Sequence, residues 1–203
     1  MTDPGTQKFP ARTDRVLDVG ALRALAHPLR VRIFDMLSQY GPQTASSLAE
    51  RLGESSGATS YHLRALAKHE LIREVEGRGT ARERWWERPA GGIELTNPDA
   101  MRTPAGRAVS QMVMSEFLRN RHEQLADFSE RGIDTETAEW RDAVIISTAN
   151  TRLTVDQTRE LSRSIQALLD AAVHTYRDQT GEGVRPVTIR ADVFPLPELG
   201  DER

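Results

Sequence analysis

The sequence predicts a mainly α-helical protein with a small β component. Apolar residues recur every three or four positions over most of the 203 residues, and Ser, Thr or Asp stands where these periodic stretches begin. Only a few short stretches, after the fourth predicted helix and near the C-terminus, have the character of strands. The length is sufficient for a small domain of ordinary size followed by a second element of similar length.

Two helices are predicted before residue 42. The first begins at Asp14 or Asp18, and His27-Pro28 then interrupts the pattern, because the residue before a proline avoids helical geometry while proline suits a first helical turn. The second helix runs from Pro28 to about Tyr40. His27 beside this proline is interpreted as a structural cap in preference to a metal ligand.

Residues 44–71 predict two helices joined by a tight turn. The segment 44–52 (TASSLAERL) is amphipathic, and Gly53 closes it before Ser55 caps the next helix. In the segment 55–71 (SSGATSYHLRALAKHEL), leucines form an apolar stripe, whereas the opposite face is small, polar or basic. The apolar face is expected to pack in the core and the other face to contact a partner.

The stretch LIREVEGRGTARERWWER predicts a β-hairpin, with strands at 71–75 and 82–88 and a glycine-rich turn at 77–81. A helix-turn-helix followed by an arginine-bearing hairpin is typical of DNA readers, because the second helix fits the major groove and the arginines reach phosphate. An ordinary helical hairpin in a core is the alternative. Trp85 and Trp86 point to opposite faces of one strand, so we expect the C-terminal half to cover one of them, with an effector pocket as the alternative.

Four motifs in order carry a resemblance to a known family: ALAHPLRVRIFDML at 24–37, then TASSLAERLG, TSYHLRALAKHELI and GRGTARERWWE. Over about residues 18–90 the chain resembles the winged helix-turn-helix of ArsR-type bacterial transcriptional regulators. The resemblance implies a sequence-specific, usually dimeric DNA-binding regulator. Members of this family often hold metal through cysteines or a His/Asp set, and this chain departs from both patterns.

On this interpretation we expect a homodimeric repressor that reads a pseudo-palindromic operator on double-stranded DNA. Arg64 is expected to take guanine, and His62 either to orient the helix or to bond a phosphate. The predicted DNA-binding residues are Ser56, Gly57, Ser60, Tyr61, His62, Arg64, Arg78, Arg82 and Arg84. The alternative function is a winged-helix protein-interaction module without direct DNA readout, which would give no reason for arginines on both the helix and the hairpin.

The charge distribution fits a DNA reader in the N-terminal half. Residues 1–92 hold 14 Lys+Arg and 11 Asp+Glu, a net charge of +3, and the rest of the chain therefore holds 27−14=13 and 30−11=19, a net charge of −6. We expect the basic half to approach phosphate and the acidic half to stay away from it.

We expect a flexible tail at 1–17, the winged helix-turn-helix domain at 18–92, and a dimerisation domain with a possible small-molecule effector site at 93–203. In the last region the sequence predicts a long helix at 103–131 and a β-α-β segment at 142–194. The long helix is interpreted as a dimer interface, with packing on its own protomer as the alternative. Two strands alone are marginal, so they must pair with each other, the wing or the partner's copy. A chain ending near Pro98 is expected to keep the recognition helix folded and to lose the dimer.

The sequence lacks the motifs that are typical of several other classes of protein. The sequence has no GxSxG elbow, P-loop, GxGxxG or HExxH motif, so an enzyme is not expected. The absence of cysteine excludes disulfides and thiolate ligands, and only His122, Glu123 and Asp127 cluster on the long helix; we expect neither a metal site nor a cofactor. No apolar run approaches the ~20 residues that span a bilayer, and we expect a soluble cytoplasmic protein.

Overall fold

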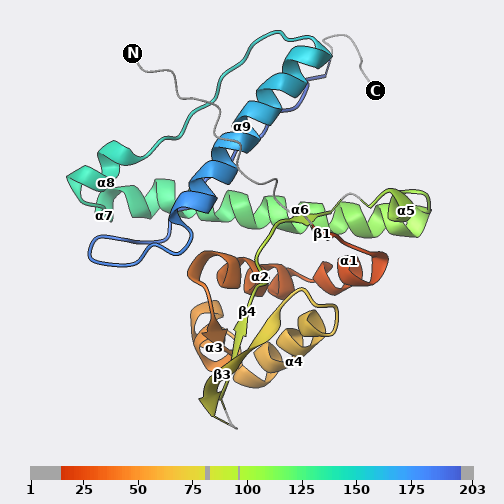
Figure 1. The fold of residues 1–203 in the computed structure, drawn as a ribbon, viewed down its shortest axis with the longest axis vertical. Coiled ribbons are helices and arrows are strands. Elements are labelled where there is room, and N and C mark those ends of the chain that lie inside the picture. Colours follow the sequence, from red (N-terminus) through yellow and green to blue (C-terminus); the bar gives the residue numbers. More distant parts are fainter. Residues whose placement is uncertain (1–14, 81–82, 96, 198–203) are drawn as a thin grey trace. The chain divides into compact units, whose positions relative to one another are not determined.

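The structure of the protein is a computed structural model that describes residues 15–80, 83–95 and 97–197. These residues divide into two compact units, 15–145 and 146–197 (Figure 1). As predicted, the chain is mostly helical with a small β component. Each unit is described by itself below.

Five helices of the first unit begin where the sequence predicts, whereas the short helices at 98–101, 133–135 and 138–143 were not predicted. Asp18, Thr44, Ser55 and Thr103 each accept a hydrogen bond from a backbone N–H of the first turn that follows, and His27 caps the helix that starts at Pro28. The helices are α1 (Val19–Leu25), α2 (Pro28–Tyr40), α3 (Ala45–Leu52), α4 (Ser56–Ala67), α5 (Pro98–Met101), α6 (Pro104–Asp127), the π-helix η1 (Phe128–Gly132), α7 (Ile133–Thr135) and α8 (Ala138–Ala143).

Two small sheets complete the first unit. One is antiparallel with the order β2-β4-β3 and contains β2 (Gln43–Thr44), β3 (Arg73–Thr80) and β4 (Glu83–Glu87). The predicted hairpin is therefore confirmed, but β3 extends through the glycines that we expected in the turn. The second sheet was not predicted: β1 (Arg15–Val16) pairs in parallel with β5 (Ile93–Glu94).

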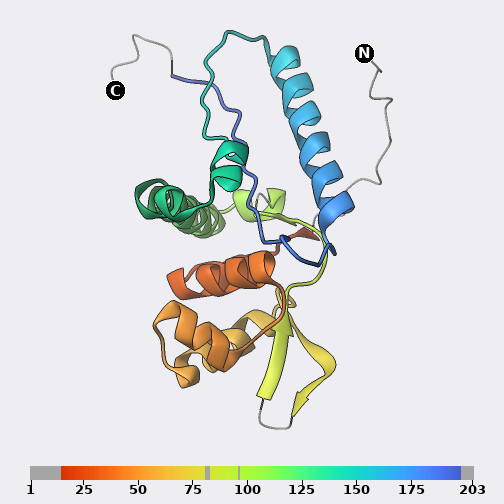
Figure 2. The ribbon, with the colours of Figure 1, turned by 90° about the vertical axis from the view of Figure 1, so that its left-hand side faces the viewer.

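The helices of the first unit are stacked in layers. α6 packs on α1 and α2, these pack on α4, and α3 and the β2-β4-β3 sheet complete the side that is farther from α6 (Figures 1 and 2). Leu22, Ile33, Leu63 and Trp86 belong to one buried cluster, which therefore joins α1, α2, α4 and the hairpin. Burying a side chain of this size contributes about 1.5–3 kcal/mol, so this cluster fixes α4 and the hairpin relative to each other.

The long helix α6 belongs to the same core. Val113 on α6 and Ala100 on α5 are fully buried in the cluster of the first unit, and Phe117 packs edge-on against Phe34 of α2. The boundary that we expected at residue 92 therefore falls inside a compact unit that reaches residue 145. A chain ending near Pro98 would lose these core residues, so the structure gives a reason to expect that its recognition helix is destabilised.

The β-α-β segment expected at 142–194 is only partly confirmed. Its helix is α9 (Val155–Tyr176), and Thr154 and Gln157 form the predicted capping box. Residues 142–143 end α8, however, and the described residues 144–153 and 186–194 contain no strand. The chain on each side of α9 runs back along the helix, as the strands of a β-α-β unit would (Figure 2). The alternating pattern was not sufficient for a strand, because a strand also needs a neighbour that pairs with its backbone.

Candidate nucleic-acid interface

The recognition helix α4 is held by its apolar face. Leu63 and Leu66 are fully buried, and Thr59 is buried with its hydroxyl donating to the carbonyl of Ser55 at 3.0 Å. At the N-terminus, Ser55 Oγ accepts from the amide of Ala58 at 3.1 Å. These contacts fix one side of the helix and leave the other side to face a partner.

The exposed face of α4 contains most of the predicted base-reading residues. Ser56, Gly57, Tyr61 and Arg64 are exposed, and Ser60 is half-buried between them. A Cβ atom at Gly57 would have no neighbour within 4 Å, so packing within the chain does not require glycine there. The small side chains at the start of the helix permit close approach of a large partner, and the free amides of a helix N-terminus attract phosphate.

Arg64 differs from Arg73 and Arg84 of the hairpin, which form ion pairs with carboxylates. Among the described residues, Arg64 has no ion-pair partner. Lys68, which our sequence analysis did not include, is exposed at the C-cap of α4, four residues after Arg64. Residues four apart share one face of a helix, so the sequence spacing could have indicated this second cation.

His62 lies on the opposite side of α4 from Arg64 and contacts α2. Its Nδ1 accepts a hydrogen bond from Arg30 Nε at 3.2 Å, and its ring centroid lies 4.5 Å from that of His27. Burial lowers the pKa of His62 below its usual value, and His27 and Arg30 lower it further. Of the two roles expected for His62, the geometry agrees with orienting the helix, because the nitrogen that faces Arg30 is already occupied.

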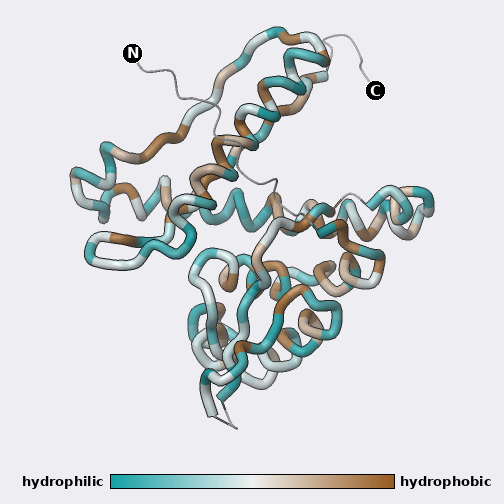
Figure 3. Tube along the Cα trace, in the orientation of Figure 1, coloured by the Kyte–Doolittle hydropathy of each residue, from teal (hydrophilic) through white to brown (hydrophobic). Residues whose placement is uncertain are grey.

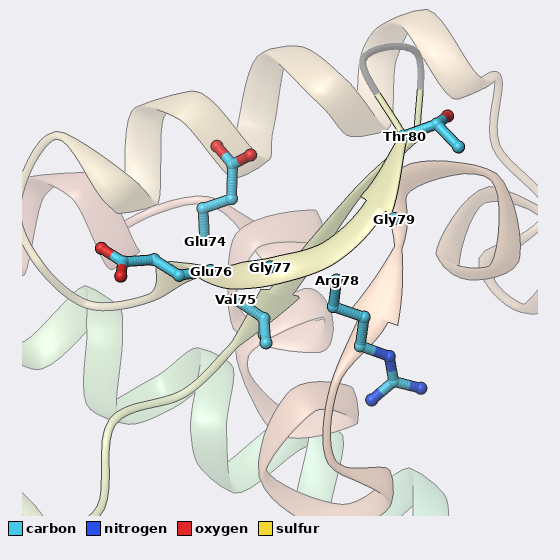
Figure 4. A pocket seen from close by; sticks show the side chains of 7 residues that line it. All are labelled: Glu74, Val75, Glu76, Gly77, Arg78, Gly79 and Thr80. Atoms are coloured by element: carbon cyan, nitrogen blue, oxygen red, sulfur yellow. The ribbon is translucent and has the colours of Figure 1, made fainter.

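Glycines give the hairpin its shape. The register between β3 and β4 shifts between Glu74 and Gly79, and Gly77 and Gly79 have φ values of 71° and 99°. Because of this irregularity, the side chain of Arg78 projects away from those of Glu74 and Glu76 (Figure 4). A Cβ at Gly79 would lie 2.1 Å from the carbonyl oxygen of Glu83, so only glycine fits this position.

The described hairpin arginines already have partners within the chain, so they are less available for contacts with DNA than the sequence indicated. Arg84 forms an ion pair with Glu74 at 3.3 Å, and Arg73 forms one with Glu87 at 2.7 Å. The guanidinium of Arg78 lies 3.6 Å above the ring of Trp85, in a cation–π contact. Arg82, the remaining predicted contact, lies outside the described residues.

The two adjacent tryptophans have different surroundings. Trp86 is buried in the core of the first unit, and Trp85 is half-buried beneath Arg78. The cluster that contains Trp86 also includes Ala100 and Val113, which lie beyond residue 92, so our expectation that the C-terminal half covers one tryptophan stays a prediction. The contact with Trp85 also holds the Arg78 guanidinium in a defined position on the hairpin surface.

Two further properties concern the chain outside this interface. Within the described ranges, no three His, Cys, Asp or Glu residues are grouped so that they could hold a metal ion. Glu123 and Asp127 on α6 form ion pairs with Arg119 and Arg131. No helix in the described part of the chain is long and apolar enough to cross a membrane.

Comparisons with known proteins agree with the fold of the first unit. A family model described as a helix-turn-helix domain matches residues 25–75, which is a quarter of the chain and extends from α1 into β3. This general model does not distinguish the ArsR type. No curated protein matches the chain.

Several solved structures are similar at low identity. They include the adhesin competence repressor AdcR from Streptococcus pyogenes (13% identity, 70% of this chain and 79% of that chain) and the transcriptional regulator Tm0710 from Thermotoga maritima (11%, 79% and 89%). Apo MarR from E. coli is similar at 13% identity, over 73% of this chain and 88% of that chain. Each comparison has a TM-score of 0.30, which carries no argument about function. From the family match and its own geometry, the chain contains a winged helix-turn-helix domain, a fold that binds DNA.

Proposed function

We propose that the chain is a sequence-specific DNA-binding transcriptional regulator of the ArsR type, and that it represses transcription as a homodimer on a pseudo-palindromic operator. The observation that carries this proposal is the exposed face of α4. This face carries small residues at the N-terminus, Tyr61 and an arginine without an ion-pair partner among the described residues, and a β-hairpin follows the helix in the chain. This is the arrangement in which a helix enters the major groove and a hairpin contacts the flanking backbone.

Within this proposal the residues have different roles. Arg64 makes a bidentate contact to guanine, and Ser56, Ser60 and Tyr61 contact base edges or phosphate through their hydroxyls. Gly57 permits close approach of the backbone, and Lys68 contacts phosphate on the same face. Arg78 contacts the DNA backbone from the hairpin, whereas Arg84 must first exchange Glu74 for a phosphate. His62 positions the helix and does not contact DNA.

The homodimer follows from the symmetry of such operators, because a twofold site needs two recognition helices. α6 is the interface we favour. Met114, Leu118 and Leu125 lie on one flank of this helix and are 40%, 49% and 45% exposed, although the neighbouring face of α6, about 100° around the helix, is buried in the core. A second copy would remove this apolar stripe from water. A small-molecule effector that alters the dimer would fit the same region.

A protein-interaction module is the second candidate, and the observation that favours it is the pairing of Arg73 and Arg84 with carboxylates of the same sheet. The salt dependence of binding distinguishes the two functions. We would titrate the full-length chain into fluorescent duplexes from its own upstream region, and into a scrambled duplex, at several stated salt concentrations. A regulator gives a preference of about a thousandfold or more for one duplex and a steep salt dependence. Equal, weak binding to both duplexes would exclude the proposed function.

A further inference from the structure

The second unit, residues 146–197, exposes a large apolar surface. Its helix α9 has no buried residue over 22 positions, although its apolar residues recur at helical spacing. Along the stripe, Ile165 and Leu169 are half-buried, whereas Leu161 and Leu168 on one flank are 40% and 71% exposed. An amphipathic helix in water owes most of its stability to the burial of its apolar face. The face of α9 is therefore only half covered within its own unit.

The two extended segments beside α9 are also uncovered. Residues 187–193 alternate apolar with polar side chains, yet Val187 and Ile189 on the apolar face are 66% and 57% exposed. Ile146 in the preceding segment is 56% exposed. Figure 3 shows the apolar residues of α9 and of the chain that flanks it. In all, thirteen large apolar side chains between residues 146 and 197 are at least 38% exposed.

The kind of partner follows from the backbone. An extended segment presents N–H and C=O groups on both sides, and these groups need partners once the apolar face leaves water. A small molecule or a helix could cover the side chains but would not pair with this backbone in a regular way. Another strand satisfies both requirements. Two strands are too few for an independently stable sheet, whereas four are sufficient.

We infer that the second copy of this chain supplies the missing strands, so that segments 144–149 and 186–194 of two protomers form one intermolecular sheet covered by their two α9 helices. This inference rests on the proposed homodimer and adds a second contact to it. A twofold axis doubles the number of strands from two to four and makes the surface complementary to itself. The described residues 146–197 carry six arginines and six carboxylates, so two copies meet without net repulsion.

The exposed apolar area is large enough for such a contact. Ten of these side chains lie in 146–153, on α9 or at 187, 189 and 193; at an exposed area on the order of 80 Å2 each, one chain offers roughly 800 Å2, which matches the ~800 Å2 per partner that a standard interface buries. The two faces of the proposed sheet have different surroundings, because only one of them packs on the α9 helices. Ile189 would face the α9 layer, and its neighbour Thr188 would face the other side of the sheet.

Ile189→Asp and Thr188→Asp form a matched pair that tests this geometry in the full-length chain. Both residues are exposed within one chain, so an isolated protomer tolerates both changes equally. In the intermolecular sheet, Ile189→Asp places a charge in an apolar layer, whereas Thr188→Asp does not. Sedimentation velocity over a range of concentrations should show the dimer dissociation constant raised by about tenfold or more for Ile189→Asp and nearly unchanged for Thr188→Asp.

Hydrogen exchange gives a second measurement, which uses the intact chain and does not require either variant to fold. In the intact dimer, the amides of 144–149 and 186–194 should be protected, and dilution to the monomer should remove this protection. A dimer in which these amides exchange freely, or a dimer dissociation constant that Ile189→Asp leaves unchanged, would overturn the inference. So would an intact chain that remains monomeric at every concentration, because a different partner would then have to cover the surface.

DNA binding is followed in parallel so that the two proposals can fail separately. Ile189→Asp lies outside the first unit, so its binding to a single half-site should equal that of the intact chain. Normal half-site binding with an unchanged dimer dissociation constant for Ile189→Asp rejects the intermolecular sheet alone. If the intact chain binds no duplex specifically, the proposed regulatory function is rejected, whether or not the chain forms a dimer.

Discussion

Arg30 Nε donates a hydrogen bond to Nδ1 of His62 at 3.2 Å, and this contact joins α2 to the side of the recognition helix that faces away from the solvent. The same guanidinium donates to the carbonyl of Ala24 at 3.0 Å. One arginine therefore connects α1, α2 and α4. Because His62 must be neutral at Nδ1 to accept this bond, the position of α4 is coupled to the protonation of one imidazole.

We predict that the stability of the first unit decreases as the pH falls through this titration. The pKa of His62 is lowered below 6.5 in the folded chain, so the unfolded chain binds the proton more readily. The free energy of unfolding should then decline between about pH 6.5 and the lower pKa of the folded state. In His62→Gln, the stability measured by thermal unfolding should depend less on pH than in the intact protein. His122→Gln, at an exposed position on α6, is the control, and an identical pH profile for both variants would contradict the prediction.

Arg64→Ala should weaken binding to the preferred duplex by about 1 to 3 kcal/mol and relax the preference at one base pair, as the loss of a bidentate base contact does. Fluorescence anisotropy with the preferred duplex and with single-base variants measures both effects. Arg163→Ala removes the same charge from an exposed site on α9 and should leave binding unchanged. If Arg64→Ala weakens specific and non-specific binding equally, the residue contacts only phosphate.

Arg78→Ala should lower the slope of log affinity against log salt by about one, without a change in the preferred sequence. In the proposed complex Arg78 contacts the DNA backbone, and in the free protein Trp85 holds its guanidinium 3.6 Å from the ring centroid. Removal of the guanidinium also exposes that indole, and tryptophan fluorescence should report the change in the free protein. An unchanged salt slope would remove the hairpin from the interface.

Gly79→Ala and Gly77→Ala should differ sharply although both residues have positive φ. The added Cβ at Gly79 would meet the carbonyl oxygen of Glu83 at 2.1 Å, whereas at Gly77 it would meet nothing within 4 Å. We expect Gly77→Ala to destabilise by about 1 kcal/mol and Gly79→Ala to disrupt the hairpin. Thermal unfolding and DNA affinity measure the difference. Equal effects of the two substitutions would show that the backbone conformation, and not the contact with Glu83, limits the hairpin.

A chain that ends at Ile145 should fold with a recognition helix as stable as that of the intact protein, whereas a chain that ends at Pro98 should not. The shorter chain loses Val113, a fully buried side chain worth about 1.5–3 kcal/mol, together with the partly buried Phe117, and an ordinary domain is stabilised by only about 5–15 kcal/mol. Circular dichroism and half-site binding of both fragments test the prediction. A folded, DNA-binding chain ending at Pro98 would show that α6 is dispensable to the domain.

Most of the fold could be predicted from the sequence because helix boundaries depend on neighbouring residues. The caps at Asp18, Thr44, Ser55 and Thr154 each act within three positions of the chain, and Pro28 restarts a helix through its own ring. The positions of the recognition helix and its exposed face follow from the same local rules. For this reason Tyr61 and Arg64 lie on the predicted side.

The sequence by itself determined the longer helices, the order of the motifs and the exposed residues of α4, whereas the tertiary structure decided which residues meet. The pairing of Arg84 with Glu74 depends on the register between β3 and β4, the contact of His62 with Arg30 depends on how α2 crosses α4, and the burial of Val113 depends on where α6 lies. Residues 186–194 have the pattern of a strand and form none in the described chain. Helical hydrogen bonds join residues four apart, so the local sequence determines them, but a strand's hydrogen bonds and a side chain's neighbours come from distant segments that the local pattern does not specify.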